Sequence, residues 1–157
     1  MLLSININNY TLVETLEIEF SSGTTAITGE TGAGKSLLLD ALGMALGDRA
    51  DTGTIRHGKD RAEITATFDI KGLEEASEWL ESNDFNADDQ CILRRLYTIE
   101  GRSRGYINGQ SCTMQQLQQL MQIKKKVKKK KLLKKKNNKI IIVKTPRYDL
   151  KKLCFYL

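Results

Sequence analysis

Residues Gly29 to Ser36 form the pattern in this chain that is most closely tied to a particular chemistry. Their sequence, GETGAGKS, fits GxxxxGK[ST] and lies between a short apolar run and a longer apolar run of helical period. In such a loop the backbone N–H groups and the following helix N-terminus hold phosphate oxygens. Lys35 would reach the β- and γ-phosphates, and the Ser36 hydroxyl would bind Mg²⁺. The spacing therefore predicts a site for a nucleoside triphosphate such as ATP, formed by Gly29, Glu30, Thr31, Gly32, Ala33, Gly34, Lys35 and Ser36.

The elements around this loop follow from the spacing of apolar residues. Alternation from Leu3 to Phe20 predicts two strands joined at Asn8-Asn9-Tyr10, a strand over 24–28 enters the loop, and three- and four-residue spacing predicts a helix over 36–46. Further strands are expected over 64–68, 91–97 and 105–107, with a short helix over 73–80. Asn108-Gly109 predicts a hairpin, and Thr113 with Gln116 predicts a capping box at the start of another helix.

The charge of the chain is divided unevenly between its two parts. The total of 157 residues suits one modest domain, and the formal net charge of +6 suggests a nucleic-acid partner. Residues 1–123, however, hold 10 Lys and Arg against 18 Asp and Glu, whereas residues 124–157 hold 15 against 1. We therefore expect a domain over 1–123 and a separate Lys/Asn/Ile-rich tail over 124–157.

Two interpretations of this tail stay open. Its residues have codons made mostly of A and T, which is typical of translated A/T-rich DNA outside the proper frame, so the tail would be out-of-frame or disordered. A basic arm for nucleic acid or acidic lipid is the alternative. Apolar residues in the tail follow neither the helical nor the strand period, which favours the first interpretation.

Cysteine spacing and hydropathy bear on the compartment. Cys91, Cys112 and Cys154 lack the CxxC spacing of a zinc site and form an odd set, so no disulfide framework is predicted. The N-terminal residues lack a basic leader, and no apolar run reaches the roughly 18 to 20 residues that span a bilayer. We expect a cytoplasmic protein without a membrane partner.

Longer stretches on both sides of the loop carry a family resemblance. Two predicted strands followed by AITGETGAGKSLLLDALGMALGDRA resemble the head domain of SMC-like ATPases. IRHG, AEITATFDI and ILRRLYTIEGRSRGYINGQSCTMQQLQQL resemble more closely the RecN family of bacterial DNA-repair proteins, over residues 1 to about 122. The resemblance implies an α/β fold of the P-loop NTPase class: the N-terminal lobe of an SMC/ABC-type head, with a mixed sheet and an antiparallel β subdomain.

The resemblance also implies a role and partners. Proteins of this family act in recombinational repair of damaged DNA, including double-strand breaks, which places them on the nucleoid. Two heads enclose ATP between them, so hydrolysis would need a second head or a C-terminal lobe. Arg49, just beyond the predicted helix, corresponds to an arginine that senses DNA in the family. The alternative for Arg49 is a solvated loop residue paired with Asp48 or Asp51.

Several family motifs are absent from the sequence. After the LQQL helix the lysine tract begins where a glutamine-bearing loop is expected, and neither a signature motif nor a Walker B Asp-Glu strand occurs. Phosphoryl transfer needs a metal, a positioned water and charge stabilisation together. No catalytic residue is therefore assigned, appreciable ATP hydrolysis by this chain alone is not expected, and whether it is an enzyme stays open. Beside a truncated RecN-like ATP-binding protein, the alternatives are a non-functional remnant of a broken repair gene and a small P-loop phosphotransferase.

Two further candidates are weaker. His57 is the only histidine and has no partner at catalytic spacing, so a loop position is favoured over catalysis. Four arginines surround a predicted hairpin and are candidates for a patch that touches DNA phosphates: Arg94, Arg95, Arg102 and Arg104. Arginines that are merely solvated on a strand face cannot be distinguished from such a patch by sequence.

Overall fold

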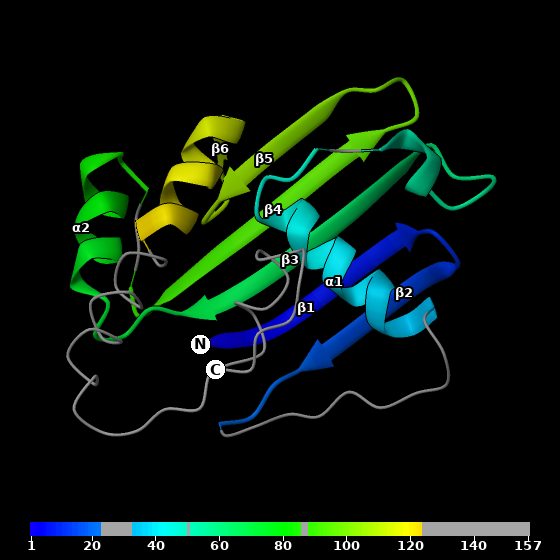
Figure 1. Ribbon diagram of the computed structural model, residues 1–157. Helices are drawn as coiled ribbons and strands as arrows, with labels where there is room; N and C mark the ends of the chain where they lie inside the picture. Colours follow the sequence, from blue (N-terminus) through cyan, green and yellow to red (C-terminus); the bar gives the residue numbers. More distant parts are fainter. Residues whose placement is uncertain (23–32, 50, 86–87, 124–157) are drawn as a thin grey trace, which may run out of the picture.

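Period-two alternation of apolar residues produces a six-stranded antiparallel sheet in the order β2-β1-β3-β4-β5-β6 (Figure 1). The computed structural model describes residues 1–22, 33–49, 51–85 and 88–123, without the side chains of 33–35. The strands are β1 (Leu2–Tyr10), β2 (Val13–Glu19), β3 (Arg61–Asp69), β4 (Gln90–Thr98), β5 (Ser103–Ile107) and β6 (Gln110–Cys112). The helices are α1 (Ala33–Ala45), the 3-10 turn η1 (Thr52–Thr54), α2 (Glu74–Ser82) and a helix over residues 114–123.

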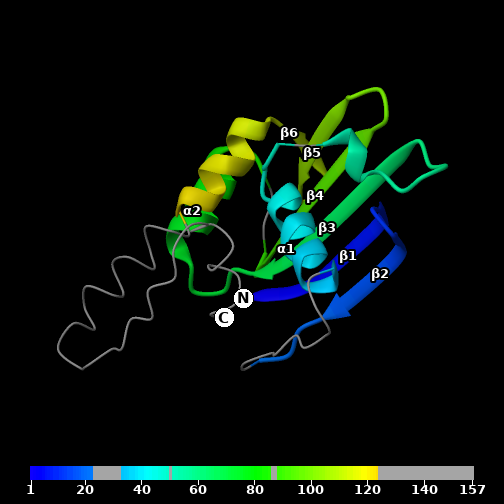
Figure 2. The same cartoon turned by 45° about the vertical axis from the view of Figure 1, so that its right-hand side comes forward.

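One face of the sheet is apolar and carries the helices. On β4, for example, the buried residues are Cys91, Leu93, Arg95 and Tyr97, in strict alternation with more exposed ones. Helix α1 lies against β1, β3 and β4. Ala76 of α2 and Leu120 of the 114–123 helix line one small apolar cavity together with inward residues of β3 and β4. Figure 2 shows the three helices gathered over this side of the sheet, so a single core joins them.

The local signals at the hairpin and at the capping box are confirmed. Asn108 and Gly109 both have positive φ, at 49° and 82°, which is the geometry of a two-residue hairpin turn between β5 and β6. The Gln116 N–H donates to Thr113 Oγ1 at 3.2 Å, and the Thr113 N–H donates to Gln116 Oε1 at 2.9 Å. Two otherwise unpaired donors at the start of the 114–123 helix are thereby satisfied.

The turn between β1 and β2 differs from the expectation. The strands are joined at Thr11 and Leu12 rather than at Asn8-Asn9-Tyr10, because β1 continues through Tyr10, which pairs with Val13. Tyr10 is only 3 % exposed, so its burial outweighs the turn propensity of the two asparagines before it. Asn9 nevertheless adopts a positive φ of 52°, which asparagine tolerates better than most residues.

The α/β fold class is confirmed. All described strand pairs are antiparallel, as expected of the β subdomain. The predicted strand over 24–28, which would contribute to a mixed sheet, lies outside the described residues. Among the described helices, none combines the length and the apolar character needed to cross a membrane.

Candidate nucleotide site and the loop after its helix

The phosphate-loop motif leads into the first turn of α1. Residues 29–32 lie outside the described part of the chain, and Ala33, Gly34 and Lys35 are described by their backbone, which is already helical. The helix therefore begins three residues before the predicted start at Ser36. The first N–H groups of a helix have no partner within it and are available to an anion. No acidic side chain occupies the first turn of α1, and Ser36 is exposed there, so the chemistry of this end fits a phosphate with a bound Mg²⁺.

Helix α1 is held in place by its apolar side. Its fully or almost fully buried residues pack against the sheet: Leu38, Ala41, Leu42, Met44 and Ala45. The helix ends at Ala45 and is closed by Gly47, whose φ of 99° suits glycine, with the Asp48 N–H donating to Gly43 O at 3.0 Å. This closure fixes the direction in which the chain leaves the helix.

Arg49 is exposed and follows this closure directly. It therefore lies beyond the C-terminal end of the 13-residue helix, which is about 20 Å long at 1.5 Å per residue. The length of α1 thus separates Arg49 from the described start of the helix at Ala33. Within the described ranges Arg49 forms no ion pair, either with Asp48 or with Asp51.

The segment after Arg49 is bound to the sheet at several points. The Asp51 carboxylate caps η1 by accepting from the Gly53 N–H at 2.9 Å. Ile55 forms an isolated bridge with Tyr10 of β1, and the Thr11 N–H donates to Thr54 O at 2.6 Å. The Thr54 hydroxyl lies 2.9 Å from the Tyr97 hydroxyl of β4. Apart from the Asp51 cap, these contacts join residues more than forty positions apart, and no local pattern in the sequence indicates them.

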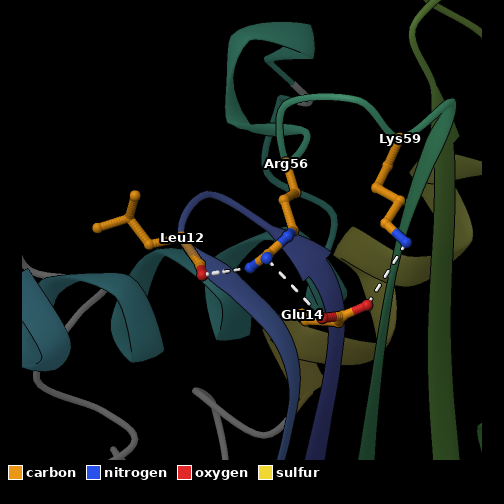
Figure 3. A network of polar contacts seen from close by, with 4 residues as sticks. All are labelled: Leu12, Glu14, Arg56 and Lys59. Atoms are coloured by element: carbon orange, nitrogen blue, oxygen red, sulfur yellow. Dashed lines mark hydrogen bonds and ion pairs between the residues drawn. The ribbon is translucent and has the colours of Figure 1, made fainter.

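A second set of polar contacts fastens the same segment to the β1–β2 turn (Figure 3). Arg56 Nη1 donates to Leu12 O at 2.7 Å, and the Arg56 guanidinium lies 3.8 Å from the Glu14 carboxylate. Lys59 Nζ lies 3.5 Å from the same carboxylate. His57, between these two residues, is exposed. Two of the three basic residues of the segment therefore have a structural partner.

Burial changes the acidity of the groups beneath the segment. Burial, followed by the charges of Tyr97 and Asp40, raises the pKa of Tyr10 to about 12. Burial likewise raises the pKa of Tyr97. Both phenols are therefore neutral hydrogen-bonding groups near pH 7.

The four arginines of the β4–β5 region do not form one patch. Arg94 faces the side of the sheet without helices, where its Nε and Nη2 each donate at 2.9 Å to the Glu63 carboxylate and its guanidinium lies 5.1 Å from the Tyr106 ring centre. Arg95 faces the core and is 3 % exposed, whereas Arg102 lies 3.4 Å from Glu100 in the turn. Arg104 is exposed on β5. Strand alternation alone would have placed Arg94 and Arg95 on opposite faces.

The fold is similar to that of SMC head domains. The SMC head bound to the C-winged helix domain of ScpA superposes with a TM-score of 0.66 at 22% identity, over 78% of this chain and 40% of that one. A structure from work on ATP-driven dimerization and DNA-stimulated activation of SMC ATPases gives a TM-score of 0.62 at 23% identity, over 78% of each chain. These likenesses define the fold.

Sequence comparison gives the family. The chain belongs to the AAA-domain family, whose model matches residues 4–153. Its N-terminal region is RecN-like: it is 46% identical over 123 residues to the DNA repair protein RecN of Vibrio cholerae and 42% identical over 125 residues to RecN of Haemophilus influenzae. Each alignment covers 78% of this chain and 22% of the relative, so the chain spans about a fifth of the length of these relatives.

Proposed function

We propose that this chain binds ATP with Mg²⁺ at the N-terminal end of α1, as part of a RecN-like protein of DNA repair. The observation that supports this most directly is the first turn of α1, which contains the Gly-Lys-Ser motif. No acidic residue stands in that turn to repel a phosphate, and Ser36 is exposed. In this proposal Gly29 to Gly34 supply backbone N–H groups and Lys35 contacts the β- and γ-phosphates. Ser36 is a ligand of Mg²⁺.

Ligand-induced stabilisation tests this proposal on the full chain. At 100 times the dissociation constant, a ligand that binds only the folded state stabilises it by about 2.7 kcal/mol, which raises Tm by about 8 °C for a chain of this size. We expect Mg-ATP to produce such a shift and Lys35→Ala to abolish it. Lys71→Ala is the matched control, because Lys71 is an exposed lysine whose partner is Asp89, at 3.7 Å. An unchanged Tm with Mg-ATP, or an unchanged shift in Lys35→Ala, would refute the proposed site.

The wider role follows from the same family. We propose that DNA and a second head or C-terminal lobe are partners of this domain, and that it works in the cytoplasm on the nucleoid in the repair of broken DNA. The RecN relatives support the repair role, and the SMC ATPases with ATP-driven dimerization support the need for a partner head. The part of the reaction assigned to this chain is nucleotide binding.

Arg49 is proposed as a DNA contact. It is exposed and has no ion-pair partner among the described residues, so its guanidinium is available to a phosphate. The slope of log K against log salt falls by about 0.9 for each phosphate contact that is removed, whatever the basic tail contributes. Arg49→Ala should therefore reduce the slope for duplex DNA by about one, and Arg102→Ala, in which the arginine lies beside Glu100, should not. Equal slopes for all three proteins would remove Arg49 from the DNA contact.

A further inference from the structure

An inward residue of β4, Tyr97, lies beneath the segment that follows Arg49. Tyr97 is 1 % exposed, and alternation points it into the core. Its hydroxyl lies 2.9 Å from the hydroxyl of Thr54, which follows Arg49 in the chain. Tyr97 does not belong to the phosphate loop.

The direction of the hydrogen bonds at Tyr97 is determined by the network. Thr54 Oγ1 donates to Asp51 O at 2.6 Å, and its single proton is used in that bond. At 2.9 Å from Tyr97 the Thr54 oxygen must therefore accept, so the Tyr97 hydroxyl is the donor. The Asp51 carbonyl also accepts from the Thr54 N–H at 3.0 Å. A continuous path of hydrogen bonds thus runs from β4 to Asp51, two residues after Arg49.

We propose that Tyr97 is a positioning residue that holds the segment after Arg49 over β4, through Thr54 and Asp51. The role of the segment in DNA contact rests on the proposed function of Arg49, but its anchoring does not. Strand β4 and the chain that leaves the phosphate-loop helix are then one mechanical unit. Displacement of either changes the place at which Arg49 meets a phosphate.

Hydrogen exchange of the full chain tests the Tyr97 anchor. The amides of Thr54 and Ile55 donate to Asp51 O and Thr52 O. In Tyr97→Phe these two amides should exchange about fivefold faster, because the loss of one hydrogen bond of about 1 kcal/mol corresponds to that ratio. Amides of β3 should keep their rates. Tyr106→Phe is the matched control, because Tyr106 lies on the other face beside Arg94. Unchanged rates at Thr54 and Ile55, or a uniform acceleration of all amides, would overturn the anchor.

The experiment uses neither nucleotide nor DNA, so its outcome is independent of the proposed ATP and DNA binding.

Discussion

Gly47→Ala is the substitution whose effect follows most directly from the geometry at the end of α1. Gly47 has a φ of 99°, where an L-residue with a Cβ is strained by about 1 to 2 kcal/mol. A Cβ there would also lie 3.2 Å from Gln118 Cγ and 3.4 Å from Leu117 Cβ, so these side chains of the 114–123 helix would have to shift by a few tenths of an ångström. Reduced freedom of the unfolded chain returns about 0.4 to 1 kcal/mol. We expect a net loss of about 2 kcal/mol in the free energy of unfolding.

Urea denaturation measures this loss, and Gly58→Ala separates its two causes. Gly58 also has a positive φ, 78°, but a Cβ there meets nothing within 4 Å. We therefore expect Gly58→Ala to cost about 1 kcal/mol, and Gly47→Ala to lower the urea midpoint by about 1 M at unchanged m. Gly47→Asn should cost less than Gly47→Ala, because asparagine tolerates positive φ. A loss in Gly47→Ala no larger than in Gly58→Ala would refute the packing of the 114–123 helix against the end of α1.

Three further substitutions test the core, the outer face and the buried phenols. Leu42→Ala should destabilise the fold by about 2 to 4 kcal/mol in urea, because Leu42 is 4 % exposed between α1 and the sheet. A double-mutant cycle of Glu63→Gln and Arg94→Met should give a coupling of about 1 kcal/mol or less, because both side chains are partly exposed, and a coupling near 3 kcal/mol would contradict this. The pKa of Tyr10 is near 10 in the unfolded state and about 12 in the folded state, so the unfolded state binds fewer protons between these pH values. The free energy of unfolding should therefore fall by about 2 to 3 kcal/mol as the pH rises over that interval. Tyr10→Phe should flatten this part of the pH profile.

The described strands and the helix after the phosphate-loop motif could be predicted because both are local patterns. Alternation along β3 and β4 locates the buried face, and the apolar spacing after the motif locates α1, with its start misplaced by three residues. Arg95 is an instructive failure, since the same alternation that buries Leu93 and Tyr97 also buries Arg95. Its charge nevertheless suggested a surface patch with Arg94. The strand period was a better guide to its place than the type of its side chain.

The long-range contacts of the candidate site could not be predicted. The Glu63–Arg94 pair depends on the register between β3 and β4, and the Thr54–Tyr97 bond depends on how the chain after α1 returns to the sheet. The spacing of residues in the sequence determines neither the strand register nor the path of the chain after α1. The β1–β2 turn was misplaced for a related reason, because Tyr10 is buried and forms a bridge with Ile55, which is distant in the sequence.

The strand order has a consequence for how this domain reaches its native state. β1 pairs with β2 on one side and β3 on the other, and residues 20–60, which contain the whole nucleotide motif, form one excursion between those two pairings. Hairpins β1–β2 and β4–β5–β6 close short loops, whereas β1–β3 pairing must close this long one, at a greater entropic cost. We expect that pairing to be the late event in folding. We therefore expect the strands on either side of the nucleotide motif to pair last. A ligand at α1 would then slow unfolding more than it would accelerate folding.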